Sequence, residues 1–312
     1  MLLLRYFYEQ KQFVFFSLAI LCFMCFNSYL PSKWKYGIRI PARNNRLLFT
    51  RSVVTVYSPL QESKNKNPLI AIGGGITSRK IYSVNESNIG KKFQFFQTFM
   101  LTFCRTASRH FVYMFYLGYD YNDRVFANQR LRDAFLRHFH FMTTSGSCSG
   151  RHITANLSLL KCEYSGRPTW SQNDAMLEAY LDNADYFYRV NDDTMMLTGG
   201  WPEMFISALE RYDPPRVGVV GPTHYGGNIG ILTYDFVHRT HIDIFGFYYP
   251  HWFSDWWGDN WITRVYRPRR STKIRQVRLV HTMKMGRRYS IHWRALRHLN
   301  EQLAHGKDVI NR

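Results

Sequence analysis

The sequence predicts an α/β fold, in which a mixed, mainly parallel sheet is flanked by helices and preceded by one N-terminal transmembrane helix. Short apolar and aromatic runs alternate with longer amphipathic segments, which is the pattern of parallel strands joined by helices. Several of these runs end in glycines or acidic residues, as strands do at a ligand-binding edge of a sheet. An uncharged, mostly apolar stretch occupies residues 13–30.

The composition limits the classes of protein to which the chain can belong. Aromatic residues make up 17% of the 312 residues, enough to build a large core and to exclude disorder as the dominant state. The net charge of +19 favours anionic partners such as nucleotide diphosphates, acidic glycans, anionic lipid headgroups or nucleic acid. Because there is no helix-turn-helix, zinc-finger or RNP pattern, we expect no nucleic-acid partner.

The N-terminal region is expected to anchor the chain in a membrane. Residues 13–30 would span roughly 27 Å as a helix, and no small-residue cleavage site follows them. A short tail at residues 1–12 precedes this anchor, and a basic stem at residues 31–67 follows it. Two of the five cysteines lie in the apolar stretch, so the folded part retains three and can form at most one disulfide. No cysteine spacing matches a zinc site.

The folded domain is expected at residues 69–300, with a tail at residues 301–312. Strands are predicted at residues 69–72, 111–117, 186–190, 217–220 and 277–281, and helices at residues 91–108, 126–139, 171–183 and 203–211. The strand at 69–72, the helix at 91–108 and the strand at 111–117 follow one another in the order that a right-handed parallel crossover requires.

Polar residues after the first two strands are candidates for binding a nucleotide. Three glycines and then Thr77 and Ser78 follow the first strand, where backbone N–H groups can face a phosphate or a nucleoside. A plain turn is the alternative. Asp120 follows the second strand and can hold a base or a ribose, although a solvated loop acid fits equally well. Asn173, near the start of a helix, is the fourth candidate.

The stretch around which the chain is organised is a buried strand that runs into Asp192 and Asp193. In open α/β sheets, ligands bind beyond the carboxyl ends of the strands. Carboxylate oxygens suit Mg²⁺ or Mn²⁺, which are commonly held by one or two acids together with substrate phosphates. The pair therefore predicts a metal site that binds a nucleotide diphosphate, with a solvated Asp-Asp turn as the alternative.

Across residues 69–293 the chain resembles the nucleotide-sugar glycosyltransferases of the GT-A (Rossmann-like) fold. Four motifs carry the resemblance. They are NDDT at 191–194, similar to the acidic metal motif; YGGNIG at 225–230, similar to the glycine-containing loop; WWGDNW at 256–261, similar to the segment with the catalytic acid; and VRLVH at 277–281, similar to the strand that ends in a metal-binding histidine. Residues 237–250 also resemble chondroitin-type and related type II membrane transferases of N-acetylhexosamine. The chain departs from the family in having Asn-Asp-Asp for Asp-any-Asp and Gly-Asp-Asn for Glu-Asp.

The resemblance implies a metal-dependent enzyme that moves a hexose or N-acetylhexosamine from a UDP-sugar to a glycan or glycoprotein acceptor, with inversion. It implies a Mn²⁺ or Mg²⁺ ion on three residues, which are Asp192, Asp193 and His281, with His292 as the competing histidine. Asp259 would be the catalytic base, with Asp255 as the alternative. Three residues would close over the pyrophosphate, Arg287, Arg288 and Tyr289, unless they form only a solvated basic face.

The resemblance also implies a single-pass type II protein of the Golgi or endoplasmic reticulum membrane, with a lumenal catalytic domain. Sequons at Asn85 and Asn156 favour this orientation, whereas the basic residues that follow the apolar stretch oppose it. The alternative function is a catalytically inactive, transferase-like or lectin-like membrane protein that binds glycans through its tryptophans.

Overall fold

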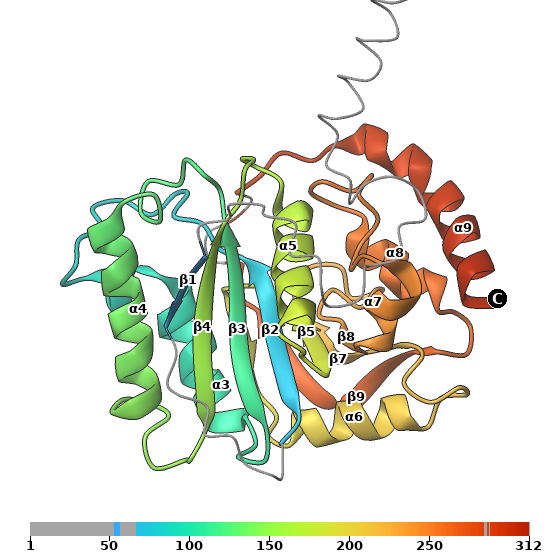
Figure 1. Cartoon of the computed structure of the whole chain (residues 1–312), viewed down its shortest axis with the longest axis horizontal. Coiled ribbons are helices and arrows are strands. Elements are labelled where there is room, and N and C mark those ends of the chain that lie inside the picture. Colours follow the sequence, from blue (N-terminus) through green and yellow to red (C-terminus); the bar gives the residue numbers. More distant parts are fainter. Residues whose placement is uncertain (1–52, 57–66, 284–285, 287, 312) are drawn as a thin grey trace, which may run out of the picture. The chain divides into compact units, whose positions relative to one another are not determined.

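The computed structural model describes residues 53–56, 67–283, 286 and 288–311. Within them, one sheet has the strand order β1-β4-β3-β2-β5-β8-β7-β9-β6 (Figure 1). The strands are β1 (Val53–Val56), β2 (Leu69–Gly75), β3 (Val112–Tyr119), β4 (Thr154–Lys161), β5 (Tyr186–Arg189), β6 (Thr194–Met196), β7 (Val219–Tyr225), β8 (Phe236–His238) and β9 (Ser271–His281). The helices are α2 (Ile89–Lys92), the π-helix η2 (Phe95–Met100), α3 (Leu101–Thr106), α4 (Gln129–Thr144), α5 (Pro168–Leu181), α6 (Trp201–Glu210), α7 (Thr240–Phe245), α8 (Gly258–Val265), the 3₁₀-helix η3 (Trp293–His298) and α9 (Leu299–Asn311).

The sheet is mixed, as predicted, and its parallel strands are the ones that position the candidate site. Strands β4, β3, β2 and β5 are parallel neighbours, so their carboxyl ends meet at one edge. Strand β8 pairs with β5 and β7 in antiparallel fashion, and β9 runs parallel to β7. Strand β6, which follows β5 after a short turn, pairs antiparallel with the end of β9. This last pairing carries the end of β9 to the same edge.

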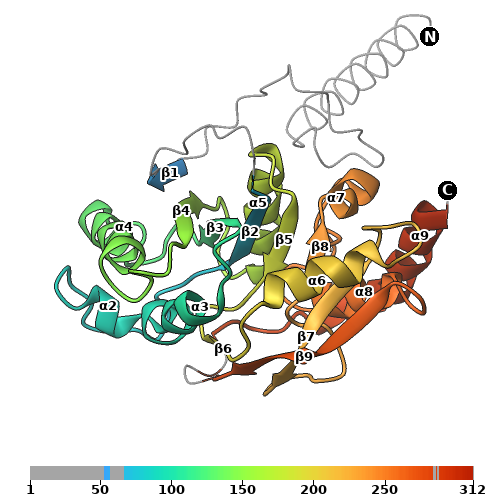
Figure 2. The ribbon, with the colours of Figure 1, turned by 90° about the horizontal axis from the view of Figure 1, so that it is seen from below.

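Helices cover both faces of the sheet because alternate strand residues are apolar. On β3, Tyr113 and Phe115 face a core formed with η2, α3, α4 and α6. Met114 and Tyr116 face a second core formed with α5, α7, α8 and α9. Figure 2 shows α3 and α5 on opposite sides of β2 and β3. The predicted α/β class with helices on both faces is therefore confirmed.

The three glycines after residue 72 belong to β2 and permit close packing, so they do not form a phosphate-binding turn. A Cβ at Gly73 would lie 2.6 Å from the side chain of Met176 on α5. A Cβ at Gly74 would lie 2.5 Å from the carbonyl oxygen of Val190, just before the acid pair. The small residues thus let α5 and the end of β5 approach β2.

We expect Gly74→Ala to destabilise the fold by about 1–3 kcal/mol, because the added methyl group must displace backbone at Val190. The measurement is the free energy of unfolding in urea. Gly75→Ala is the matched control, since its Cβ would meet no atom closer than 3.6 Å. Equal stability of the two variants would contradict this explanation of the glycines.

Several sequence-based boundaries were wrong. Strand β4 was missed altogether, and the helix expected at residues 91–108 is divided among α2, η2 and α3. Strand β1 lies inside the range expected to be a stem, and α9 occupies the range expected to be a tail. Cys104 and Cys148 form the single disulfide that the cysteine count allowed, while Cys162 is a buried thiol.

Two expectations about membrane topology meet the structure differently. The predicted anchor at residues 13–30 lies outside the described residues, and none of the described helices is both long enough and apolar enough to cross a bilayer. Asn85 is exposed in a turn, but Asn156 is buried within β4. Since glycosylation acceptors lie on the surface, the sequon at Asn156 does not support a lumenal domain.

Candidate active site

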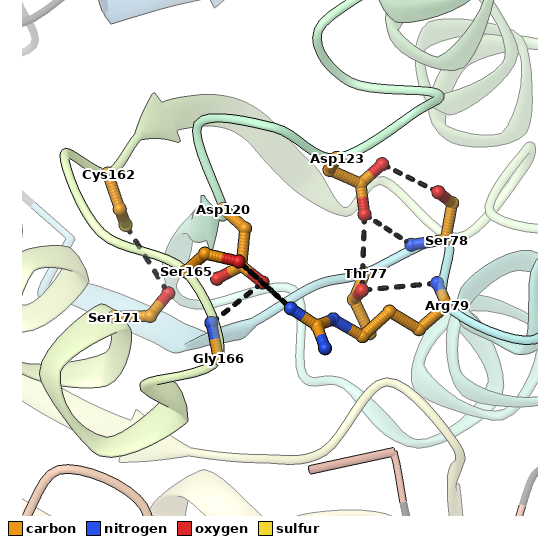
Figure 3. A network of polar contacts seen from close by, with 9 residues as sticks. All are labelled: Thr77, Ser78, Arg79, Asp120, Asp123, Cys162, Ser165, Gly166 and Ser171. Carbon is orange, nitrogen blue, oxygen red and sulfur yellow. Dashed lines mark hydrogen bonds and ion pairs between the residues drawn. The ribbon is translucent and has the colours of Figure 1, made fainter.

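The loops that leave β2, β3 and β4 are tied together by two aspartates (Figure 3). Asp123, just beyond β3, accepts hydrogen bonds from the Ser78 backbone N–H and hydroxyl, both at 2.7 Å, and from the Thr77 hydroxyl at 3.1 Å. Its carboxylate also accepts the backbone N–H groups of Val125 and Phe126. Thr77 and Ser78, predicted to bind a nucleotide, are thus nearly fully buried and fix the shape of this loop.

Asp120 lies at the same edge and connects three loops. It accepts a hydrogen bond from Arg79 at 3.0 Å and another from the backbone N–H of Gly166 at 3.0 Å. Figure 3 shows the Arg79 side chain extended across this space, where it also reaches Ser165. Asp120 is 5% exposed, so its charge is held by these partners and it does not act as a solvated loop acid.

A polar hollow of about 380 Å³ opens beside Arg79. Its lining comprises Arg79, Ser165, Gly166, Arg167, Asp255, Tyr289, Ser290, Ile291 and His292. The ring of Tyr289 lies under the Arg79 guanidinium, 5.2 Å from centroid to Cζ. Burial raises the pKa of the Tyr289 phenol above its ordinary value, and the Asp120 charge adds to the rise. The phenol is therefore neutral.

The acid pair stands where β5 ends, and its first member forms an ion pair with Arg288. Both oxygens of Asp192 accept hydrogen bonds from the Arg288 guanidinium, one of them at 2.7 Å. The side chains of Asp192 and Arg288 are 4% and 15% exposed. This bidentate pair joins β5 to the segment whose next residue, Tyr289, lines the hollow.

The second acid faces the predicted histidine. Thr194 of β6 pairs with His281 of β9, which brings Nε2 of His281 to 3.2 Å from Oδ1 of Asp193. Burial by itself would raise the pKa of the Asp193 carboxyl. His281 and then Arg288 outweigh burial and hold this pKa below its usual value, so the carboxylate is charged.

The glycine-containing loop closes on the same histidine. Gly226 and Gly227 have φ angles of +85° and +71°, in the left-handed region that favours glycine. A Cβ at Gly226 would lie 2.7 Å from the His281 carbonyl oxygen, and one at Gly227 would lie 3.4 Å from Nδ1 of the ring. The loop therefore holds His281 in place from the side of β7.

Two of the three predicted metal ligands fit a shared cation. Oδ1 of Asp193 is buried and has no hydrogen-bond partner within the described residues, and it faces Nε2 of His281. An acidic oxygen and a ring nitrogen in this arrangement suit a divalent ion. The third, Asp192, is engaged by Arg288. Among the described residues, no cluster of three or more histidine, cysteine or acidic side chains is arranged to hold a metal.

The two candidate bases lie in different surroundings. Asp255 lines the hollow and accepts the backbone N–H of His292 at 2.8 Å. Asp259, in the first turn of α8, accepts the Thr233 hydroxyl at 3.4 Å and does not line the hollow. His292, the alternative metal ligand, is among the residues that line the hollow, whereas His281 meets the acid pair.

The remaining predicted residues are not at the site edge or are not described. Asn173 exchanges two hydrogen bonds with the backbone of Tyr249, at 2.7 and 2.8 Å, and joins α5 to the segment before α8. Its role in the structure is therefore to fix that segment. Arg287 lies outside the described residues.

Sequence reasoning missed a buried acid close to the site. Asp235 is 0% exposed and accepts hydrogen bonds from the phenols of Tyr248 and Tyr249. Burial raises its pKa to about 7, although the two phenols and Arg189 act against the rise. In the sequence, Asp235 is a single acid within a strand-like run of apolar residues. No motif around it indicates that it is buried near the site.

This raised pKa predicts a pH dependence of stability. Between the unfolded pKa near 4 and the folded pKa of about 7, the unfolded chain releases the Asp235 proton and the folded chain keeps it. The contribution of Asp235 to the free energy of unfolding is thus largest below pH 4. It falls as the pH rises from 4 to 7, by at most about 1.4 kcal/mol per pH unit. Urea unfolding of the wild type and Asp235→Asn at several pH values measures it. A stability difference that is constant with pH would refute the assignment.

Comparisons with known proteins give a weak likeness. Residues 1–349 of TarS from S. aureus align with a TM-score of 0.43 and 12% sequence identity, over 78% of this chain and 69% of that chain. The complex of S. aureus TarS 1–349 with UDP aligns with a TM-score of 0.44, at the same identity and coverage. No protein-family model and no curated protein matches.

Proposed function

We propose that the chain is a GT-A-type glycosyltransferase that moves a hexose or N-acetylhexosamine from a UDP-sugar to a glycan or glycoprotein acceptor, with inversion. The observation that carries the proposal is the meeting of Asp192, Asp193, His281 and Arg288 at the carboxyl edge of the parallel strands, beside a polar hollow. Two acids, an imidazole and a guanidinium together suit a diphosphate and its counter-ion.

The donor would lie along this edge. Arg288 would donate to a phosphate the same two N–H groups that it now donates to Asp192. A diphosphate can therefore replace Asp192 as the partner of Arg288. The nucleoside would enter the hollow, where Arg79, Tyr289 and the Gly166 loop present polar groups and an aromatic ring. The loop geometry that Asp120 and Asp123 enforce keeps these groups in position.

A Mn²⁺ or Mg²⁺ ion, held by Asp193 and His281, would supply positive charge against the charge that develops on the leaving diphosphate. In an inverting reaction, a carboxylate removes the proton of the acceptor hydroxyl. We assign this role to Asp259, with Asp255 as the alternative, and comparison of Asp259→Asn with Asp255→Asn decides between them. Attachment to a Golgi or endoplasmic reticulum membrane through residues 13–30 belongs to the same proposal and is supported by the apolar sequence there.

A second candidate is a transferase-like glycan-binding protein that does not turn over a donor. The bidentate ion pair favours it, because Arg288 engages both oxygens of one of the predicted metal ligands, Asp192. The two candidates differ in donor turnover.

The direct test of the donor site is nucleotide binding to the full chain. Calorimetric titration with UDP, uridine, GDP and ADP, with and without Mn²⁺, should give binding of UDP that strengthens with the metal. Uridine should bind far more weakly, because it lacks the phosphates that Arg288 would contact. If a folded chain binds none of the diphosphates, the proposal of a donor site at the acid pair is wrong.

A further inference from the structure

A cluster of three tryptophans lies next to two residues that line the hollow, Asp255 and His292. Trp256, Trp257 and Trp293 form this tryptophan cluster, with ring centroids 5.8 Å apart for Trp257 and Trp293 and 6.4 Å apart for each of the other two pairs. Two segments distant in the sequence build it: residues 256 and 257 precede α8, and Trp293 begins η3.

The cluster leaves a large aromatic area in contact with solvent. Trp293 is 61% exposed and Trp256 is 44% exposed, whereas the fully buried Trp201 and Trp261 belong to the cores. Indoles are costly to leave in water, and neighbouring exposed indoles commonly mark a binding surface.

The chemistry around the cluster indicates what it binds. Asp255 and His292 precede Trp256 and Trp293 in the chain, both line the hollow, and the backbone N–H of His292 donates to Asp255 at 2.8 Å. Aromatic rings therefore border a wall that carries a carboxylate, an imidazole and the nearby guanidinium of Arg167. A pyranose has this combination of surfaces, since its C–H face is apolar and its rim carries hydroxyl groups.

We infer that the tryptophan cluster is a carbohydrate subsite, in which the sugar rings of the acceptor stack on Trp293 and Trp256 while their hydroxyl groups face Asp255 and His292. That this sugar is the acceptor rests on the proposed transfer reaction. That the tryptophan cluster binds a sugar does not depend on that reaction. The location agrees with such a reaction, because two of its members, Trp256 and Trp257, lie in the chain between the two candidate bases, Asp255 and Asp259.

The test uses the full chain and measures saccharide and nucleotide binding separately. A printed array of neutral and acidic oligosaccharides identifies the strongest binder, and calorimetry then measures its affinity for the wild type and the variants. We expect Trp293→Ala and Trp256→Ala to weaken saccharide binding roughly tenfold or more, and Trp293→Phe to restore part of it, because a smaller ring can still stack. UDP binding by the same variants should be unchanged.

The matched control is Phe141→Ala. Phe141 is 54% exposed and lies on α4, at the other end of the sheet from α8 and α9 in Figure 1. This variant should bind saccharides as the wild type does.

Three results would overturn the inference. The first is saccharide binding that survives in Trp293→Ala and Trp256→Ala, and the second is the absence of saccharide binding by the folded wild-type chain. The third comes from measuring binding to phosphatidylcholine–phosphatidylserine vesicles: if the tryptophan variants lose only vesicle binding, the cluster is a membrane contact. Loss of saccharide binding in the tryptophan variants of a chain that never binds UDP would leave the subsite standing and reject the proposed function instead.

Discussion

Asp193→Asn is expected to lower donor turnover on the order of 10²- to 10³-fold while the chain stays folded. The substitution removes the negative charge that faces His281 and keeps the size of the side chain. A preorganised charge at a reacting diphosphate typically contributes an effect of this size. The measurement is the rate of UDP release from a UDP-sugar, together with the thermal unfolding temperature.

Asp133→Asn is the matched control for this change. Asp133 lies on α4 and its carboxylate contacts only Gln129 among the hydrogen bonds of the described residues. It should leave turnover unchanged. Wild-type turnover in Asp193→Asn would remove Asp193 from the mechanism.

Arg288→Ala is expected to lower the free energy of unfolding by about 3 kcal/mol. The change leaves the 4%-exposed carboxylate of Asp192 without its cation, and removing one member of a buried pair costs more than the pair contributes. Adding Asp192→Asn to Arg288→Ala should recover most of the loss, because no buried charge then remains unpaired. Urea unfolding of the four proteins of this cycle measures the coupling between the two residues.

The exposed ion pair of Arg137 and Glu86 provides the comparison. Their side chains are 64% and 52% exposed, so Arg137→Ala should cost less than about 1 kcal/mol. If Arg288→Ala costs no more than Arg137→Ala, the Asp192–Arg288 pair does not hold the edge of the sheet together.

The acid edge could be predicted from the sequence because its signal is local. A run of aromatic and apolar residues that ends in Asp192 and Asp193 has the period of a buried strand, and strand ends in an α/β sheet meet at a common edge. The approach of His281 to Asp193 was expected only through resemblance. Its physical cause is the antiparallel pairing of β6 with β9, which no local pattern announces.

Other parts of the site depend on contacts between distant residues and could not be predicted. Arg288 and Asp192 are 96 positions apart, and nothing near either residue specifies the pair. Asp123 was passed over in favour of Asp120, because both follow the same strand and only the fold decides which acid holds Thr77 and Ser78. Strand β4 was missed although polar and apolar residues alternate along it, and its polar residues Asn156 and Ser158 are buried.

The glycines of β2 show why residue type alone can mislead. Glycine after a strand is common both in phosphate-binding turns and where two backbones approach closely. At Gly74 the close approach to Val190 accounts for the residue, so this glycine lets the end of β5, and with it the acid pair, approach β2.

The most direct test of the central claim, that the acid edge transfers a sugar from a nucleotide donor, is UDP release by the full chain from a panel of UDP-sugars, with Mn²⁺ and with EDTA. The proposed function predicts release from one donor in the presence of the metal, loss of that release with EDTA, and loss in Asp193→Asn. A folded chain that binds UDP and releases none from any donor, with or without glycan acceptors, would contradict transfer and leave the glycan-binding candidate.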